Sequence, residues 1–146
     1  GYLDILGYPL CRGRVLKMLE TDRGQYDTPK DVFWATGACL MVRSKVYKAM
    51  GGLDSRFFAH MEEIDMCWRM QLEGWKVTVV PSSTVWHVGG GTLPATSPFK
   101  LFLNYRNNLL IIGASHSQAT ESHCKAGYIP FAYIFHSCHL FNIPRV

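Results

Sequence analysis

The segment FFAHMEEIDMCWRM, residues 57–70, places three carboxylates within four positions: Glu62, Glu63 and Asp65. Phenylalanine, histidine and tryptophan residues accompany them, which is unusual for a solvated run of charge. Acidic residues in the first turn of a helix stabilise it through the helix dipole by about 0.3–1 kcal/mol each, which is one explanation of Glu62 and Glu63. The other is catalytic, because a carboxylate in a partly dry pocket, with its pKa moved toward working pH, can serve as a general base.

The spacing of apolar residues predicts the helix that would position these acids. One apolar stripe consists of Met61, Ile64, Trp68, Leu72 and Trp75. Gly74 is expected to end the helix. Asp65 and Arg69 are four residues apart and are expected to pair. Glu63 lies on another face, with Met66 and Met70, so no neighbouring cation need neutralise it.

Short elements are expected before this helix. Residues 15–20 are predicted to be a short helical piece, and the apolar run at residues 32–43 a buried strand interrupted at Gly37. Residues 44–52 predict a short helix, with Ser44 as its N-cap and two glycines as its stop.

Two further elements are expected after it. Residues 76–88 are predicted to form a strand, a proline turn and a second strand. Residues 98–112 predict a helix that begins at a proline and has one face made of Phe102, Tyr105, Leu109 and Ile112. Strands alternating with helices in this order indicate an α/β fold.

A histidine precedes a glycine-rich loop at the end of the second of these strands. A lone histidine after a strand is usually structural, but three glycines, Gly89, Gly90 and Gly91, follow His87 almost at once. Glycines allow close approach of the backbone to a ligand, and strand ends are where open α/β sheets bind ligands. The stretch HVGGGT is not a P-loop, because no Lys-Ser or Lys-Thr pair follows it.

Composition limits the class of protein. The chain has 146 residues, 48% of them hydrophobic, and a net charge of +4. These values predict one globular domain with a preference for phosphates or a lipid surface, and a charge too mild to indicate nucleic acid binding. No apolar run reaches the ~18 residues of a membrane helix, and no signal peptide is recognisable at the start. The five cysteines form no CxxC pair, so reduced thiols and a cytoplasmic location are expected.

The segment from residue 113 to residue 146 differs in character. Its possible metal ligands are His116, His123, Cys124, His136, Cys138 and His139. Their spacing matches no standard zinc pattern, so we expect a divergent, poorly ordered His/Cys-rich tail.

The chain resembles the inverting family 2 glycosyltransferases, in particular the bacterial rhamnosyltransferase-like group that builds surface polysaccharides. The resemblance covers residues 7–112 and is carried, in order, by GYPLCRGR, GQYD, FWATGACLMVRSKVY, GGLDSRFFAHMEEIDMCWRMQLEGWKV, VPSSTVWHVGGGTL and FLNYRNNLL. It implies a GT-A (nucleotide-diphospho-sugar transferase) fold, with a mixed sheet flanked by helices. It also implies a nucleotide-sugar donor such as dTDP-rhamnose or a UDP-sugar, a glycan or lipid-linked acceptor, and peripheral association with the inner face of the plasma membrane.

The resemblance further implies roles for individual residues. The second acid of the family's motif is the general base, which here is Glu63, preceded by Glu62, with Asp65 as the next candidate. Acceptor-side contacts are implied for Trp34, Thr36, Gly37 and Arg69. On the donor side, His87 is similar to a histidine that helps to hold a divalent metal, Mn²⁺ or Mg²⁺, on the diphosphate, beside the glycines at 89–91.

One departure from the family pattern concerns the donor side. The family's N-terminal half carries nucleotide-binding strands and a D-x-D metal motif, whereas this sequence contains no D-x-D and no βαβ unit before the matched region. We therefore expect residues 1–112 to be the C-terminal, acceptor and base half of a GT-A domain, with the nucleotide-binding half absent.

Three other functions agree with parts of the sequence. A non-catalytic fragment, or a module completed by a separate nucleotide-binding half, is consistent with the missing motif. Glycoside hydrolysis also uses two carboxylates, which usually come from separate elements and lie ~5–5.5 or ~6.5–9.5 Å apart across the scissile bond. Glu62 and Glu63 are instead adjacent in the sequence and lie on different faces of the helix. A plain binding protein with an acidic helix face fits poorly with the phenylalanines, tryptophan and glycines around the acids.

Overall fold

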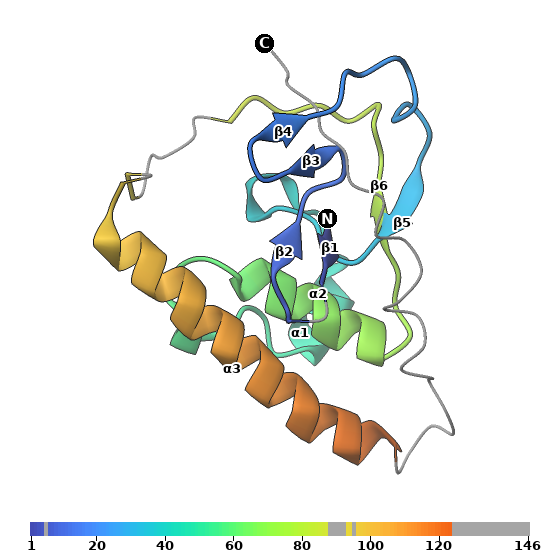
Figure 1. The fold of residues 1–146 in the computed structure, drawn as a ribbon. Helices are drawn as coiled ribbons and strands as arrows, with labels where there is room; N and C mark the ends of the chain where they lie inside the picture. The colour runs from blue at the N-terminus through green and yellow to red at the C-terminus, as the bar shows by residue number, and fades with distance from the viewer. Residues whose placement is uncertain (5, 88–92, 95, 124–146) are drawn as a thin grey trace.

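A computed structural model of the chain describes residues 1–4, 6–87, 93–94 and 96–123, and side chains as far as residue 113. Figure 1 shows the long helix α3 running past α1 and α2 along one side, with β5 and β6 on the other. The strands are β1 (Tyr2–Leu3), β2 (Pro9–Leu10), β3 (Arg14–Val15), β4 (Met18–Leu19), β5 (Lys30–Val32) and β6 (Val77–Val79). The helices are η1 (Gly37–Cys39), α1 (Ser44–Ala49), η2 (Ser55–Phe57), α2 (Glu62–Leu72) and α3 (Pro98–His123).

The strands form three separate antiparallel pairs, β1 with β2, β3 with β4, and β5 with β6. The prediction of a mixed α/β class is therefore confirmed. The expected mixed sheet flanked by helices is not found in the part of the chain that the structure describes. Each pair has at most three residues per strand, so helix packing rather than sheet pairing supplies most of the core.

Two local predictions in the first 43 residues are wrong. Residues 15–20 form the β3–β4 turn instead of a helix, with Leu16 at φ +52°, because a helix this short does not repay the cost of nucleation. The long strand expected over 32–43 ends at Val32. The chain then turns into η1, where the hydroxyl of Thr36 accepts from the N–H of Ala38 at 3.4 Å.

Two predictions after α2 have different outcomes. Gly74, at φ +82°, ends α2 as expected. β6 forms at Val77–Val79, but residues 84–87, expected as the second strand, contain no strand.

The helix predicted from SKVYKAMGG is confirmed as α1, but its start is displaced by one residue. Ser44 is the first helical residue and Arg43 occupies the N-cap without a side-chain bond, so the predicted capping role of Ser44 is wrong. Gly51 and Gly52 end the helix at φ +76° and +73°, a left-handed conformation that suits glycine.

Helix α2 lies between two apolar clusters. Met66, Cys67 and Met70 pack with residues of β5, α1 and β6 in one cluster, and Met61 and Ile64 pack with residues of η2 and α3 in the other. The predicted stripe is therefore only partly right, because the buried surface of α2 is wider than one stripe. Its last expected member, Trp75, is 46% exposed.

The helix expected at residues 98–112 is confirmed and extends to His123. Among the side chains of α3 that the structure describes, those of Leu103, Asn107, Asn108 and Ile111 are buried. The expected face of Phe102, Tyr105, Leu109 and Ile112 is exposed. Hydrogen bonds from the two asparagines decide this orientation, because a buried amide must find partners and these lie in the loops beneath the helix.

We expect Leu103→Ala to lower the free energy of unfolding by about 2–5 kcal/mol, since it removes a fully buried side chain of α3. Leu109→Ala is the matched control, because Leu109 is 70% exposed, and its effect should stay within about 0.5 kcal/mol. Urea unfolding followed by circular dichroism measures both. Equal losses would contradict the orientation of α3.

Candidate active site

The three acids occupy the first turn of α2, as predicted, but the chain enters this helix in an unusual way. Met61 stands at the N-cap with φ +73° and offers no side-chain cap. Phe58 and His60, just before it, also have positive φ values of +63° and +68°. Non-glycine residues seldom adopt this conformation, and such strain often accompanies functional sites.

Asp65 is engaged in a buried ion pair. Its Oδ2 accepts from Nε of Arg69 at 2.9 Å and from Nη2 at 2.7 Å. Arg69 also donates to the carbonyl of Gly52 at 2.9 Å and to that of Met50. The expected Asp65–Arg69 pair is thus confirmed, and it ties α2 to the end of α1.

A cavity of about 380 Å³ adjoins this ion pair. It is lined by residues 50–56, Asp65 and Arg69, and the Asp54 and Arg56 side chains within it also pair with each other, at 2.5 Å. Both charges of each pair are therefore already matched within the cavity. Glu62 and Glu63 are not among its lining residues.

Glu63 has a different environment from Asp65. Burial raises the pKa of its carboxyl above the ordinary value, and the charge of Glu62 raises it further, while the backbone N–H groups of Glu63, Gly37 and Ile64 offset part of this. The Cys67 thiol, one turn along α2, also has its pKa raised by burial. The surroundings of Glu63 are therefore drier than those of an ordinary surface acid.

Three buried polar atoms at this helix start have no hydrogen-bond partner among the described residues: Nε2 of His60, Oε2 of Glu62 and Oε2 of Glu63. Buried polar atoms are nearly always paired in proteins, so unpaired ones at neighbouring positions need an explanation such as a catalytic role. Sequence reasoning gave His60 no role. Its position beside the acids was visible in the sequence, but the burial of its ring nitrogen was not.

The segment around η1 lies against Glu63. A Cβ added to Gly37 would be 3.9 Å from both Cβ and Cδ of Glu63, and the backbone N–H of Gly37 is close enough to lower the pKa of the Glu63 carboxyl, so the two residues lie side by side. Gln71 holds the start of this segment, donating to the carbonyl of Phe33 at 2.6 Å. Of the predicted acceptor-side residues, Gly37 is thus brought to the candidate base, and Thr36, which precedes it, is exposed.

Trp34 is partly buried and packs against both apolar clusters. Its indole N–H donates to the carbonyl of Tyr2 at 2.9 Å, so this group is already paired. The neighbouring Phe33 ring meets Trp68 of α2 edge to face, with centroids 5.2 Å apart. Aromatic packing therefore fixes the segment that leads from β5 to η1.

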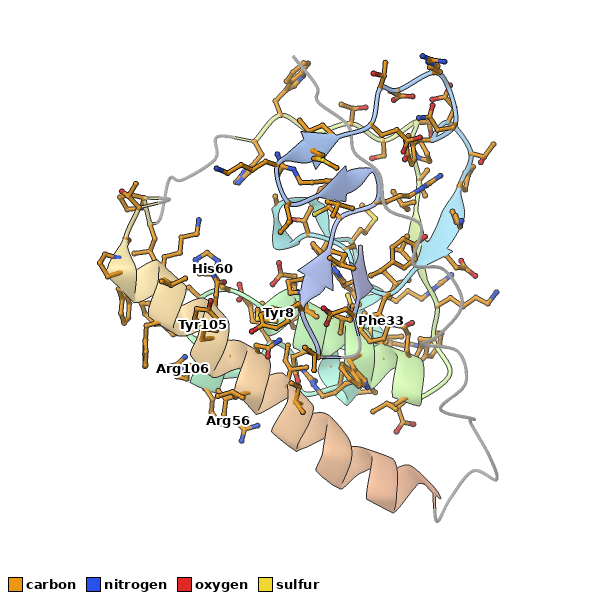
Figure 2. All side chains as sticks on the ribbon, viewed as in Figure 1. Tyr8, Phe33, Arg56, His60, Tyr105 and Arg106 are labelled. Atoms are coloured by element: carbon orange, nitrogen blue, oxygen red, sulfur yellow. The ribbon has the colours of Figure 1, made fainter. Side chains whose placement is uncertain are left out.

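Helix α3 supplies two residues that hold the loop before α2. The side-chain amide of Asn107 donates to the carbonyls of Phe57, Ala59 and His60, and Arg106 donates to those of Arg56 and Phe57. Figure 2 shows Arg106 and Arg56 on the same side of the molecule, with His60 near the first half of α3. These contacts were missed from the sequence, because NYRNN alone does not show which loop lies beneath the helix.

The donor-side residues are less completely described. His87 is exposed, and Gly89, Gly90 and Gly91 lie outside the described residues, as does most of the His/Cys-rich tail. Nowhere in the described part of the chain do three His, Cys, Asp or Glu side chains gather so that they could hold a metal ion. His87 could supply one ligand, but the described residues do not form a complete Mn²⁺ or Mg²⁺ site.

The family model described as glycosyltransferase like family 2 matches residues 16–107, more than half of the chain. The chain belongs to glycosyltransferase family 2. The resemblance inferred from its motifs is thereby confirmed, and membership implies a GT-A type of fold. No solved structure gives a significant match.

Several curated proteins are similar to this family 2 chain. An N-acetylglucosaminyl-diphospho-decaprenol L-rhamnosyltransferase of Mycobacterium tuberculosis is 30% identical over 88 residues, which cover 60% of this chain and 29% of that protein. The low-salt glycan biosynthesis hexosyltransferase Agl10 of Haloferax volcanii is 25% identical over 111 residues, covering 74% and 36%. Rhamnosyltransferase WbbL of Escherichia coli is 33% identical over 51 residues, covering 35% and 19%.

The chain spans little more than a third, at most, of the length of these relatives. A helix both long enough and apolar enough to cross a membrane is not found within the described residues of this family 2 chain.

The dependence of the free energy of unfolding on pH should report the environment of Glu63. A raised folded-state pKa means that the protein loses stability as pH rises through that pKa, because the buried carboxyl must ionise. Glu63→Gln should therefore be more stable than the parent at pH 7–8, and the difference should disappear below the ordinary pKa of 4.5. Chemical denaturation between pH 3.5 and 8 measures this, with Glu73→Gln, an exposed position after α2, as the control. A difference that does not vary with pH would contradict the assignment.

Proposed function

We propose that this chain supplies the acceptor and base side of an inverting glycosyltransferase. The single observation that carries the proposal is the environment of Glu63, a partly buried carboxyl in contact with Gly37 whose pKa is raised by burial. A general base works best with a pKa near the operating pH, and burial moves Glu63 in that direction. Family membership supports sugar transfer as the reaction.

In the proposed reaction, Glu63 removes the proton from a hydroxyl of the acceptor sugar. The hydroxyl oxygen forms a bond to the anomeric carbon of the donor, while the bond from that carbon to the diphosphate oxygen breaks on the opposite face. The electron pair leaves with the nucleoside diphosphate, and the configuration at the anomeric carbon inverts. Glu63 then releases its proton to solvent.

Other site residues take supporting roles in this proposal. Glu62 favours the protonated form of Glu63 through its nearby charge. Asp65 is the weaker candidate base, because its Oδ2 already accepts two hydrogen bonds from Arg69. We place Trp34, Thr36, Gly37 and Arg69 on the acceptor side, where Arg69 also pairs with Asp65, and His87 with the glycines at 89–91 on the donor side.

We infer the substrates from the relatives. Two of the similar proteins are named rhamnosyltransferases, and one name includes a diphospho-decaprenol acceptor. We therefore propose dTDP-rhamnose or a UDP-sugar as donor and a glycan or lipid-linked saccharide as acceptor, in synthesis of a bacterial surface polysaccharide at the cytoplasmic face of the membrane. Residues 1–112 form the proposed acceptor and base half, and residues 113–146, of which 113–123 continue α3, form the proposed tail.

A second candidate is a module that is inactive until a separate nucleotide-binding half joins it. These 146 residues contain no D-x-D motif, which is consistent with this possibility. Half of a nucleotide site cannot orient a donor, and orientation supplies much of the rate of a transfer reaction.

Isothermal titration of the 146-residue chain with dTDP-rhamnose and UDP-sugars, in the presence of Mn²⁺, distinguishes the two candidates. A module is expected to give no heat of binding alone, and to give donor binding and transfer once co-expressed with a D-x-D-bearing nucleotide-binding half of the family. Donor binding by the chain alone would reject the module.

Glu63→Gln tests the base directly in a preparation that transfers sugar. General-base catalysis contributes about 10²–10⁴-fold, so the initial rate of transfer should fall by at least about 10²-fold while the circular dichroism spectrum stays unchanged. Glu73→Gln, on the exposed end of the same helix, should keep the parental rate. Normal turnover by Glu63→Gln would move the base elsewhere, with Asp65 the next position to substitute.

A further inference from the structure

The loop between η2 and α2 carries three residues in a conformation that glycine, rather than larger residues, ordinarily adopts. Phe58, His60 and Met61 have φ values of +63°, +68° and +73°. Such a run persists only where surrounding contacts overdetermine it. The contacts that do so here come from α3.

Asn107 holds this loop through its carbonyls. Nδ2 of Asn107 lies 3.0 Å from the carbonyl oxygen of Phe57, 2.8 Å from that of Ala59 and 2.6 Å from that of His60. The side chain is completely buried, so its two amide hydrogens are shared among these three acceptors without competition from solvent.

Arg106 fixes the direction in which that amide points. Its Nε and Nη2 donate to Oδ1 of Asn107 at 2.9 and 2.8 Å, which forces Nδ2 toward the loop. Nη2 also donates to the carbonyls of Arg56 at 3.0 Å and Phe57 at 2.8 Å. The carbonyls of residues 56, 57, 59 and 60 are therefore all held by two adjacent side chains.

The loop in turn sets the start of α2. The carbonyl of Met61 accepts the first helical hydrogen bond, from the N–H of Asp65 at 2.9 Å. Met61 is buried with Ile64, Phe57 and Ile111, the last of these one turn beyond Asn107 on α3. The direction in which Glu63 leaves the helix start is thus determined by residues that α3 holds in place.

We propose that Asn107, oriented by Arg106, is a positioning residue that locks the left-handed loop at residues 58–61 and thereby keeps the Glu63 carboxyl in its partly buried site against Gly37. The catalytic role that this gives Asn107 rests on the proposed function, in which Glu63 is the base. The structural link from Asn107 to the environment of Glu63 is independent of the proposed function.

The neighbouring Asn108 provides a matched control. It is also a buried asparagine of α3, but its Nδ2 donates to the carbonyl of Leu6, in the turn between β1 and β2, at 3.4 Å. A general loss of α3 packing should follow from either substitution, whereas loss of the Glu63 environment should follow only from substitution of Asn107.

The test is the pKa of the Glu63 carboxyl, measured by ¹³C NMR titration of the 146-residue chain. Glu62 and Cys67 are the titratable groups that face Glu63, so their titrations are followed in the same spectra. In Asn107→Ala and Asn107→Asp, the pKa of Glu63 should fall toward the ordinary value of 4.5, because the loop relaxes and admits water. In Asn108→Ala it should stay raised. A folded Asn107 variant with the parental pKa of Glu63 would overturn the proposal.

A second variant covers the case in which both Asn107 variants fail to fold. Arg106→Leu keeps the Asn107 amide but leaves it unoriented, and should lower the pKa of Glu63 while the chain stays folded. A parental pKa in that variant counts against the proposal. Phe58 is 72% exposed, so it can be replaced without loss of buried packing. When Phe58→Gly is combined with an Asn107 variant or with Arg106→Leu, it should restore the raised pKa of Glu63, since glycine adopts φ +63° without help. Absence of any rescue would show that strain is not what Asn107 opposes.

Kinetics separate this proposal from the proposed function. In a preparation that transfers sugar, Asn107→Ala should lower kcat about 10-fold or more, because the base is misplaced, and shift the acid limb of the rate–pH profile to lower pH, with little change in KM for the donor. If Glu63→Gln keeps full activity, the proposed function fails, while the NMR result for Asn107 still stands or falls by itself.

Discussion

The hydrogen bonds from one buried asparagine amide to the carbonyls of a left-handed loop constrain the rest of this structure. Without these bonds, no interaction would offset the strain of three positive φ values in non-glycine residues, and the chain would enter α2 in another direction. The same bonds turn Asn107 inward and so turn the aromatic side chains of α3 outward. The hydrogen bonds of Asn107 therefore fix the loop that leads to the candidate base and, together with the hydrogen bond of Asn108, the orientation of α3.

Two acids on the same helix have different chemical surroundings because of their positions relative to a cation. Asp65 lies one turn before Arg69 and forms a buried ion pair with it, which is a structural use of charge. Glu63, two residues earlier, points away from that pair and toward η1, where burial raises its pKa. The higher proton affinity that a general base needs therefore arises at Glu63, which no cation of the described residues pairs with, whereas the charge of Asp65 is neutralised by Arg69.

Sequence patterns succeeded where local physics decides the outcome. The bounds of α2 and the stop at Gly51 follow from apolar periodicity and from the conformational freedom of glycine, both of which act within a few residues. Sequence patterns failed where residues distant in the sequence determine the local structure. Of the run at 32–43 only Val32, the last residue of β5, is in a strand, because β6 pairs with no residue beyond it. Residues 15–20 turn back as a hairpin instead of forming an isolated helix.

The sequence by itself determined the family, through ordered motifs along residues 7–112 and the family-model match to residues 16–107, and the placement of three acids at a helix start. It also determined the pairing of Asp65 with Arg69, since four-residue spacing on a helix brings side chains together. Only the tertiary structure decided that Glu63 is partly buried against Gly37 and that Asn107 and Arg106 hold the loop before it. Long-range hydrogen bonds join residues up to 102 positions apart, and no local pattern encodes which distant carbonyl a side chain will meet.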